Sequence, residues 1–201
     1  MLHLTSFGRV PLINSNRIAI IGAHTTDLAF GLGDGMPWPR SAIKQDMARF
    51  KRITSDAPEG KKNLLIAGYK TFVGMGSKTL PNRFMASISR KIQHPTSFGN
   101  DTFGASSIEL LLDYVEREIP NLHNVFFIGG EFIWLRGMNI SNRAYITEIQ
   151  KNVEDHRLLR RLTSPLSEQL VQAGFVLHKS NRIVDDWNGS VQLDFLEYIR
   201  K

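Results

Sequence analysis

The stretch Asn124-Val-Phe-Phe-Ile-Gly-Gly130 decides the fold. Its short apolar run is bounded by a polar residue and two glycines, which is typical of a strand buried on both faces. A helix to about Arg136 is expected after the glycines. A strand followed by a helix is the repeating unit of a parallel sheet covered by helices.

The same pattern recurs towards the N-terminus. Further buried strands are expected at 18–23, 63–67 and 83–89. Helices are expected at 41–54, near Lys70, and after Ser106-Ser-Ile-Glu109, which has the spacing of a capping box. The segments 24–40 and 97–105 are expected to be loops, because the first is rich in glycine and the second in Gly, Ser, Asn and Thr.

Towards the C-terminus, residues 144–149 alternate and continue the sheet. Residues 175–177 and 191–198 are expected to form a closing hairpin. The sequence thus predicts an α/β fold with a mostly parallel central sheet, helices on both faces and an antiparallel C-terminal edge. We expect one domain over residues 1–201, with an N-terminal extension at 1–17 ahead of the first strand at 18–23. In an alternative alignment, Met1–Phe7 forms the first strand instead.

Composition excludes several classes of function. The chain has 201 residues, 42% of them apolar, and no Cys, which excludes disulfides and thiolate chemistry. It has no metal-ligand cluster and no apolar run long enough to span a bilayer. The net charge is +6, but the basic residues are scattered, and the densest group, 156–161, contains no aromatic residue. We expect a cytoplasmic protein without metal, membrane or nucleic-acid partners; the oligomeric state is not indicated.

The clearest functional signal lies in Gly31-Leu-Gly-Asp-Gly-Met-Pro-Trp38 and the helix after it. Asp46 lies on the same helix face as Ile43, Met47 and Phe50, and an inward carboxylate is costly unless a partner or a ligand satisfies it. The glycines do not form a dinucleotide-binding G-x-G-x-x-G, since position 36 is Met. We expect a mobile loop that lies over a site.

Two strand-to-helix junctions are candidate phosphate sites. Gly68-Tyr-Lys-Thr71 offers backbone N–H groups, a hydroxyl and a lysine, and Gly129-Gly130 lets the backbone approach a pyrophosphate closely. Either alone is more often a plain turn, but two at the carboxyl ends of strands form a ligand crevice. Ser89-Arg90-Lys91 adds a basic pair suited to a terminal phosphate.

In combination these motifs resemble those of dihydrofolate reductases, from about Ile18 to Ile149 and more weakly to the C-terminus. The resemblance rests on Gly-Met-Pro-Trp38, Asp46-x-x-x-Phe50-Lys-Arg, Gly68-x-Lys-Thr71, Leu80-Pro-x-Arg83, Ser89-Arg90, Ile-Gly-Gly130 and Ile-Thr147. The run from Leu28 to Gly35 is similar to the reductases of T-even-type phages, for which the location is the host cytoplasm.

The resemblance implies a dihydrofolate-reductase-like fold and NADPH-dependent reduction of dihydrofolate to tetrahydrofolate, with antifolates as further ligands. It implies that Asp46 binds the pterin, supported by Thr147, and that Trp38 belongs to the closing loop. Implied substrate contacts are Ala23, Met47, Phe50, Met75 and Arg83, the last for the glutamate carboxylate. Implied cofactor contacts are Gly31, Met36, Gly68, Lys70, Thr71, Ser89, Arg90, Ile128, Gly129 and Gly130, with a cis peptide at Gly129–Gly130 and an adenosine-binding subdomain at about 62–125.

Three positions depart from the family pattern. Tyr69 stands where many relatives have a basic residue, Trp134 replaces a tyrosine, and 154–157 replace an acid-threonine stretch. Two alternatives therefore stay open. One is a pyrimidine reductase of riboflavin synthesis, which would need neither the acid helix nor Arg83; the other is a reductase-fold structural or binding component, for instance of a phage particle.

Overall fold

A nine-stranded sheet forms the centre of the computed structural model, which describes residues 13–39, 41–99 and 101–201. The strand order is β10-β11-β8-β1-β7-β3-β4-β6-β5. Six neighbouring strands run parallel: β8 (Arg143–Ile149), β1 (Ile18–Thr25), β7 (Leu122–Gly129), β3 (Lys62–Gly68), β4 (Arg83–Ile88) and β6 (Thr102–Ala105). The predicted buried strands are therefore confirmed, and β1, which contains the predicted strand at 18–23, lies inside the sheet between β8 and β7.

Both edges of the sheet are antiparallel. The predicted C-terminal hairpin is present as β10 (Phe175–Asp186) and β11 (Ser190–Arg200), and β11 pairs with β8. At the other edge, β5 (Thr96–Gly99) pairs antiparallel with β6. The expected loop at 97–105 is wrong here, because the edge of β4 pairs with residues whose composition favours turns.

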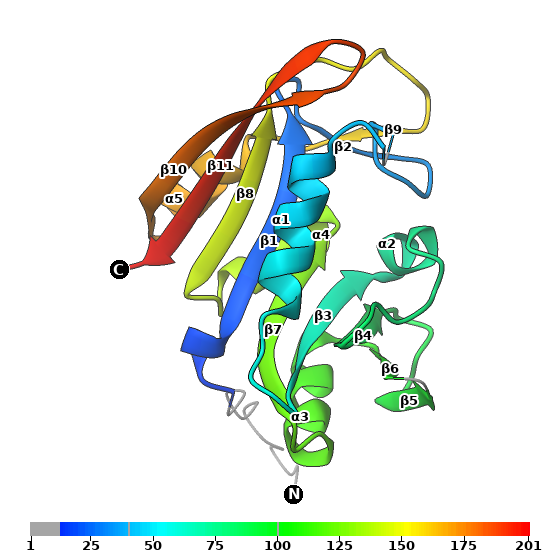
Figure 1. Cartoon of the computed structure of the whole chain (residues 1–201). Coiled ribbons are helices and arrows are strands. Elements are labelled where there is room, and N and C mark those ends of the chain that lie inside the picture. The colour runs from blue at the N-terminus through cyan, green and yellow to red at the C-terminus, as the bar shows by residue number, and fades with distance from the viewer. Residues whose placement is uncertain (1–12, 40, 100) are drawn as a thin grey trace, which may run out of the picture.

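Helices cover both faces of the sheet, as predicted (Figure 1). On one face, α1 (Lys44–Ser55) and α2 (Tyr69–Gly74) pack Phe50, Ile53 and Phe72 against a small apolar cluster. On the other face lies the larger core cluster, which is built with α3 (Ile108–Glu118), α4 (Glu131–Met138) and α5 (Leu166–Gln172). None of the helices in the described residues is both long and apolar enough to cross a membrane.

Two helices begin later than the sequence patterns indicate, α1 by about three residues and α3 by one. The helix expected from position 41 begins at Lys44, where no side chain of its own caps it; instead Asp185 of β10 accepts a hydrogen bond from the Gln45 N–H at 2.7 Å. The capping residue of α3 is Ser107, whose side chain accepts from the Leu110 N–H, rather than Ser106. The N-terminus of α1 is therefore capped by a residue of a distant strand, and that of α3 by the serine next to the expected one.

A second, two-stranded sheet takes one of its strands from the segment expected to be a loop at 24–40. It pairs β2 (Ala29–Leu32) with β9 (Leu159–Arg161), neither of which was predicted. Next to it, Trp38 and Ile43 are buried in a third apolar cluster with Trp187 of the C-terminal hairpin. This end of the molecule is therefore organised by contacts between segments far apart in sequence.

The chain enters the sheet through a 3₁₀ turn at Ser15–Arg17. Ile13 is buried in the main core, and the Arg17 guanidinium donates to the carbonyls of Leu122 and His123. The rest of the predicted N-terminal extension and the alternative strand at Met1–Phe7 lie outside the described residues.

Candidate active site

A cavity of about 590 Å³ opens at the carboxyl ends of β1 and β7, where the sheet predicts a ligand crevice. Its walls come from α1, α2 and the glycine loop that precedes α1. Most of the site residues expected from the sequence line it: Ala23, Gly31, Met36, Trp38, Asp46, Met47, Phe50, Lys70, Thr71, Met75, Arg83, Ile128, Gly129 and Gly130. The fold therefore brings together positions that are more than 100 residues apart.

Asp46 lies at one end of this cavity, on the first turn of α1. The Thr147 hydroxyl of β8 donates a hydrogen bond of 2.6 Å to Asp46 Oδ1. Burial raises the pKa of the Asp46 carboxyl above its usual value, while the hydrogen bond from Thr147 and the charge of Arg49 oppose this increase. Asp46 is thus a half-buried acid that can exchange a proton or accept hydrogen bonds from a ligand.

Arg83 lies at another part of the cavity wall, at the start of β4. It is only 4% exposed, and its guanidinium donates to Thr54 Oγ1 at 2.8 Å and to the Pro81 carbonyl at 3.1 Å. Both acceptors are neutral, and burial lowers the pKa of Arg83. In the described part of the chain no carboxylate forms an ion pair with it. Such a cation can take an anionic group of a ligand.

The Gly129–Gly130 peptide forms the floor of the cavity between β7 and α4. The peptide is cis, as predicted, and Gly129 has φ +115°, which favours glycine. A Cβ on Gly129 would come within 2.8 Å of the Trp134 ring, and one on Gly130 would meet Phe30 at 3.4 Å and Thr71 Oγ1 at 3.7 Å. A side chain is thereby excluded at Gly129, whereas at Gly130 a Cβ would make only ordinary contacts; bare backbone at both positions faces the space where a ligand can lie.

Two tryptophans border the cavity in different ways. Trp134 Nε1 donates to the Ile21 carbonyl at 3.0 Å, so this donor is used within the fold. The Trp38 Nε1 atom is buried and, among the described residues, has no hydrogen-bond acceptor. Because an unpaired buried N–H is costly, Trp38 presents a donor suited to a ligand or a bridging water.

Four predicted site residues do not line the cavity. Thr147 acts through its hydrogen bond to Asp46, and Gly68 lies behind the cis peptide, where an added Cβ would meet Ile133 at 3.5 Å. Ser89 and Arg90 follow β4 and are not among the described residues that border the cavity. Their assignment to cofactor phosphate therefore stays a prediction.

Sequence reasoning missed several lining residues. Lys51, Lys78 and Arg160 bring further positive charge to the cavity, and Phe30 packs edge-on against Trp134 with ring centroids 5.5 Å apart. Lys51 belonged to a recognised motif, so its position on α1 was available as a signal. Arg160 had none, because only the pairing of β9 with β2 places it beside the glycine loop, where it donates to the Gly33 carbonyl.

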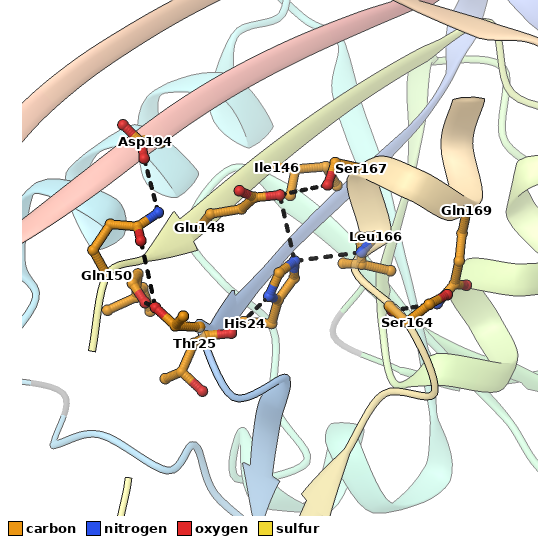
Figure 2. A network of polar contacts seen from close by, with 12 residues as sticks. His24, Thr25, Ile146, Glu148, Gln150, Ser164, Leu166, Ser167, Gln169 and Asp194 are labelled. Atoms are coloured by element: carbon orange, nitrogen blue, oxygen red, sulfur yellow. Dashed lines mark hydrogen bonds and ion pairs between the residues drawn. The ribbon is translucent and has the colours of Figure 1, made fainter. Parts of the chain in front are cut away.

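His24 lies next to the cavity residue Ala23 but belongs to a separate polar network (Figure 2). The Leu166 N–H donates to His24 Nε2 at 3.3 Å, so Nδ1 carries the proton and donates to the Thr25 carbonyl at 2.9 Å. The Ser167 hydroxyl donates to Glu148 rather than to the imidazole. This arrangement provides no activated nucleophile, and it connects β1 and β8 to α5.

Comparison with known proteins agrees with this geometry. A family model described as dihydrofolate reductase matches residues 17–197. The chain is 29% identical over 143 residues to the dihydrofolate reductase of Bos taurus, covering 67% of this chain and 73% of that protein. It is 30% identical over 138 residues to the dihydrofolate reductase of Neisseria gonorrhoeae, covering 69% and 75%.

A solved structure has the same fold. It is the dihydrofolate reductase from Enterococcus faecalis complexed with NADP(H) and RAB-propyl. The TM-score is 0.68 at 21% sequence identity, and the match covers 94% of this chain and 98% of that one.

Proposed function

Because the chain belongs to the dihydrofolate reductase family, we propose that it reduces 7,8-dihydrofolate to 5,6,7,8-tetrahydrofolate with NADPH as the hydride donor. One observation carries this function. The cavity has a half-buried carboxylate, Asp46, held by Thr147, and also a buried cation, Arg83, without an acidic partner among the described residues. Dihydrofolate has matching groups, since its pterin donates hydrogen bonds and its glutamate is anionic.

The substrate would lie along α1. Asp46 would accept hydrogen bonds from the 2-amino group and N3 of the pterin, over Ala23 on β1. Met47 and Phe50 would flank the benzoyl ring, with Met75 nearby, and Arg83 would pair with the glutamate carboxylate. This assignment is supported by the fact that all of these side chains line the same cavity.

The cofactor would lie across the bare backbone of Gly129 and Gly130. NADPH, when bound, supplies the hydride that reaches C6 of the pterin. Thr71 faces Gly130 and, with Lys70, would hold phosphate oxygens. The glycine loop from Gly31 to Met36 would cover the nicotinamide, and Ser89 and Arg90 would contact the phosphate that distinguishes NADPH from NADH. Ile128 and Gly68 would complete this side of the site.

Catalysis by these residues consists mainly of orientation and exclusion of water. Asp46 holds and polarises the pterin, and Trp38 Nε1 offers a buried donor to the ligand or to a water beside it. The proton needed at N5 comes from solvent, aided by the carboxylate. Apolar packing around Trp38 and Trp187 keeps bulk water away from this end of the cavity.

The reaction is tested by mixing the protein with NADPH and dihydrofolate and following the loss of NADPH absorbance. We expect turnover that stops when a diaminopyrimidine antifolate is added. A pyrimidine reductase would instead oxidise NADPH only with a riboflavin precursor. A structural or binding component would bind ligands without turnover, and either result would overturn the proposed function.

Three finer assignments complete the proposal. The run from Leu28 to Gly35 supports placement in the T-even-type phage branch, which a phylogeny of these reductases would test. The absence of Cys is in accord with a cytoplasmic location, which cell fractionation would test. Residues 62–125 would form the adenosine-binding subdomain, and crosslinking with an adenine-labelled cofactor would map there.

A further inference from the structure

Arg49 is a buried cation close to the proposed pterin-binding acid. It lies on α1 three residues after Asp46 and is only 6% exposed. Its guanidinium stacks over the Phe195 ring, with 4.6 Å from Cζ to the ring centroid, and lies 5.9 Å from the Tyr145 centroid. Arginine is rarely buried to this extent, so its charge needs a structural or functional reason.

The Arg49 guanidinium donates hydrogen bonds to backbone carbonyls of two neighbouring strands, β8 and β11. One nitrogen donates to the Ile146 carbonyl and the other to the Leu196 carbonyl, both at 3.2 Å, and these two residues are partners in the β8–β11 register. The first nitrogen also donates to Thr147 Oγ1 at 3.2 Å. Arg49 therefore reaches the same hydroxyl that holds Asp46.

The direction of these hydrogen bonds follows from chemistry. A guanidinium can only donate, so the Thr147 oxygen must accept from Arg49. The hydroxyl hydrogen is then left for Asp46, which receives it at 2.6 Å. A protonated Asp46 would not need this donor, whereas an ionised Asp46 is stabilised both by it and by the nearby positive charge.

Other charged groups surround this pair. Glu197 on β11 and Tyr145 on β8 interact electrostatically with Arg49, and so does Arg52, which lies three residues later on α1. Asp185 on β10 repels the charge of Asp46. Arg52 is exposed, as its place at the end of α1 predicts. Arg49 is therefore the buried cation that contacts the Asp46–Thr147 pair, and Arg52 is a natural control.

We propose that Arg49 is a positioning residue that keeps Asp46 ionised and keeps the Thr147 hydroxyl turned towards it. Arg49 does not line the cavity, so it acts through Thr147 and through its charge. The role in pterin binding rests on the proposed function, whereas the effect on Asp46 concerns the protein without ligand.

The primary test measures the carboxyl carbon of Asp46 by NMR during a pH titration of the free protein. In Arg49→Gln, which keeps an amide donor but loses the charge, the titration midpoint should rise by about one pH unit or more. Arg49→Lys keeps the charge and should recover most of this shift. Arg52→Gln removes the same charge from an exposed site and should leave the midpoint within about 0.3 units.

A second variant keeps the test valid if Arg49→Gln does not fold. Arg49→Met fills the space without an unpaired polar group, and it should give the same upward shift. A folded Gln or Met variant with an unchanged Asp46 midpoint would overturn the inference and leave Arg49 as a link between α1 and the sheet. A lower melting temperature alone would not count in its favour.

The kinetic consequence separates this inference from the proposed function. If the wild type reduces dihydrofolate, the midpoint of its pH profile for kcat/KM should move in Arg49→Gln in the direction of the NMR shift and stay in place in Arg52→Gln. An inactive wild type would refute the proposed function and leave the NMR result intact. Active variants with an unmoved pH profile would refute the role of Arg49 in the reaction.

Discussion

The acid Asp46 and the cation Arg83, which both line the cavity, differ in how the fold satisfies their charges. Asp46 receives a hydrogen bond from Thr147 and lies near the cation of Arg49. Arg83 donates only to a neutral hydroxyl and a carbonyl, and no described carboxylate pairs with it. The acid is thus held in place by the protein, whereas the cation keeps its charge available for a ligand.

This difference suggests that Asp46 orients the reacting ring and that Arg83 binds the glutamate tail. A group that must be aimed at one reacting ring benefits from a rigid setting, because small displacements reduce rates strongly. A group that grips a flexible glutamate tail needs charge and donors more than rigidity. Changes at Asp46 should therefore affect the reaction itself, and changes at Arg83 should affect which ligands bind.

The largest expected effect follows from Asp46→Asn. The amide keeps the volume and an acceptor for Thr147 but loses the charge, so kcat/KM for dihydrofolate at neutral pH should fall by about 10²–10⁴-fold. Lower pH should restore part of the loss, because substrate that is already protonated needs less help. A pH–rate profile, with NADPH binding and a thermal melt as controls, checks this; a folded variant with unchanged kcat/KM would contradict the role of Asp46.

Arg83→Lys tests the other charge. Lysine keeps the positive charge but loses the planar fork, so affinity for dihydrofolate should fall by about 10- to 100-fold. Affinity for a small diaminopyrimidine antifolate without a glutamate should change little. Binding titrations of both ligands measure the contrast, and equal losses would indicate that Arg83 serves the fold rather than the ligand.

A smaller effect is expected outside the cavity, at the exposed Arg90. Since solvent weakens an exposed ion pair, Arg90→Ala should reduce affinity for NADPH by about two- to fivefold and leave NADH unchanged. Equal changes for the two cofactors would remove Arg90 from the phosphate site.

The smallest effect concerns stability. Burial raises the pKa of Asp46 in the folded state, so the folded protein binds more protons than the unfolded chain between the two pKa values. The Asp46 contribution to stability therefore decreases as pH rises through that interval, and at neutral pH the ionised acid costs stability. Asp46→Asn should raise the melting temperature of the free protein at neutral pH and lose this advantage at low pH. A lower melting temperature at neutral pH would show that the carboxylate stabilises the fold.

Local patterns in the chain were sufficient for most of the sheet and most of the cavity. Short apolar runs predicted β1, β3 and β7, because a strand buried on both faces is apolar at successive positions. Asp46 and the glycine pair were identified by their place in the predicted elements and Arg83 by the family resemblance, and the structure brings them to the same cavity. The cis peptide at Gly129–Gly130 was predicted from the resemblance.

Where the local sequence signal was weaker, contacts with distant segments decided the secondary structure. The strands β5 and β6 arise in a stretch rich in turn residues because β4 offers an unpaired edge. The start of α1 depends on Asp185, a residue 140 positions away. Neither partner could be read from the residues nearby, since strand pairing and capping by distant groups depend on the assembled fold.

The sequence by itself thus determined the order of most strands and helices, the family and the residues of the acid helix, because these depend on periodicity and short motifs. Only the tertiary structure decided which cation lies beside Asp46 and Thr147. On sequence alone Arg49 is one more charge on an amphipathic helix, and its significance comes from β8 and β11, which supply its carbonyl acceptors and Thr147. A buried charge is tolerated only where partners from several elements meet, and the assembled fold alone creates such a place.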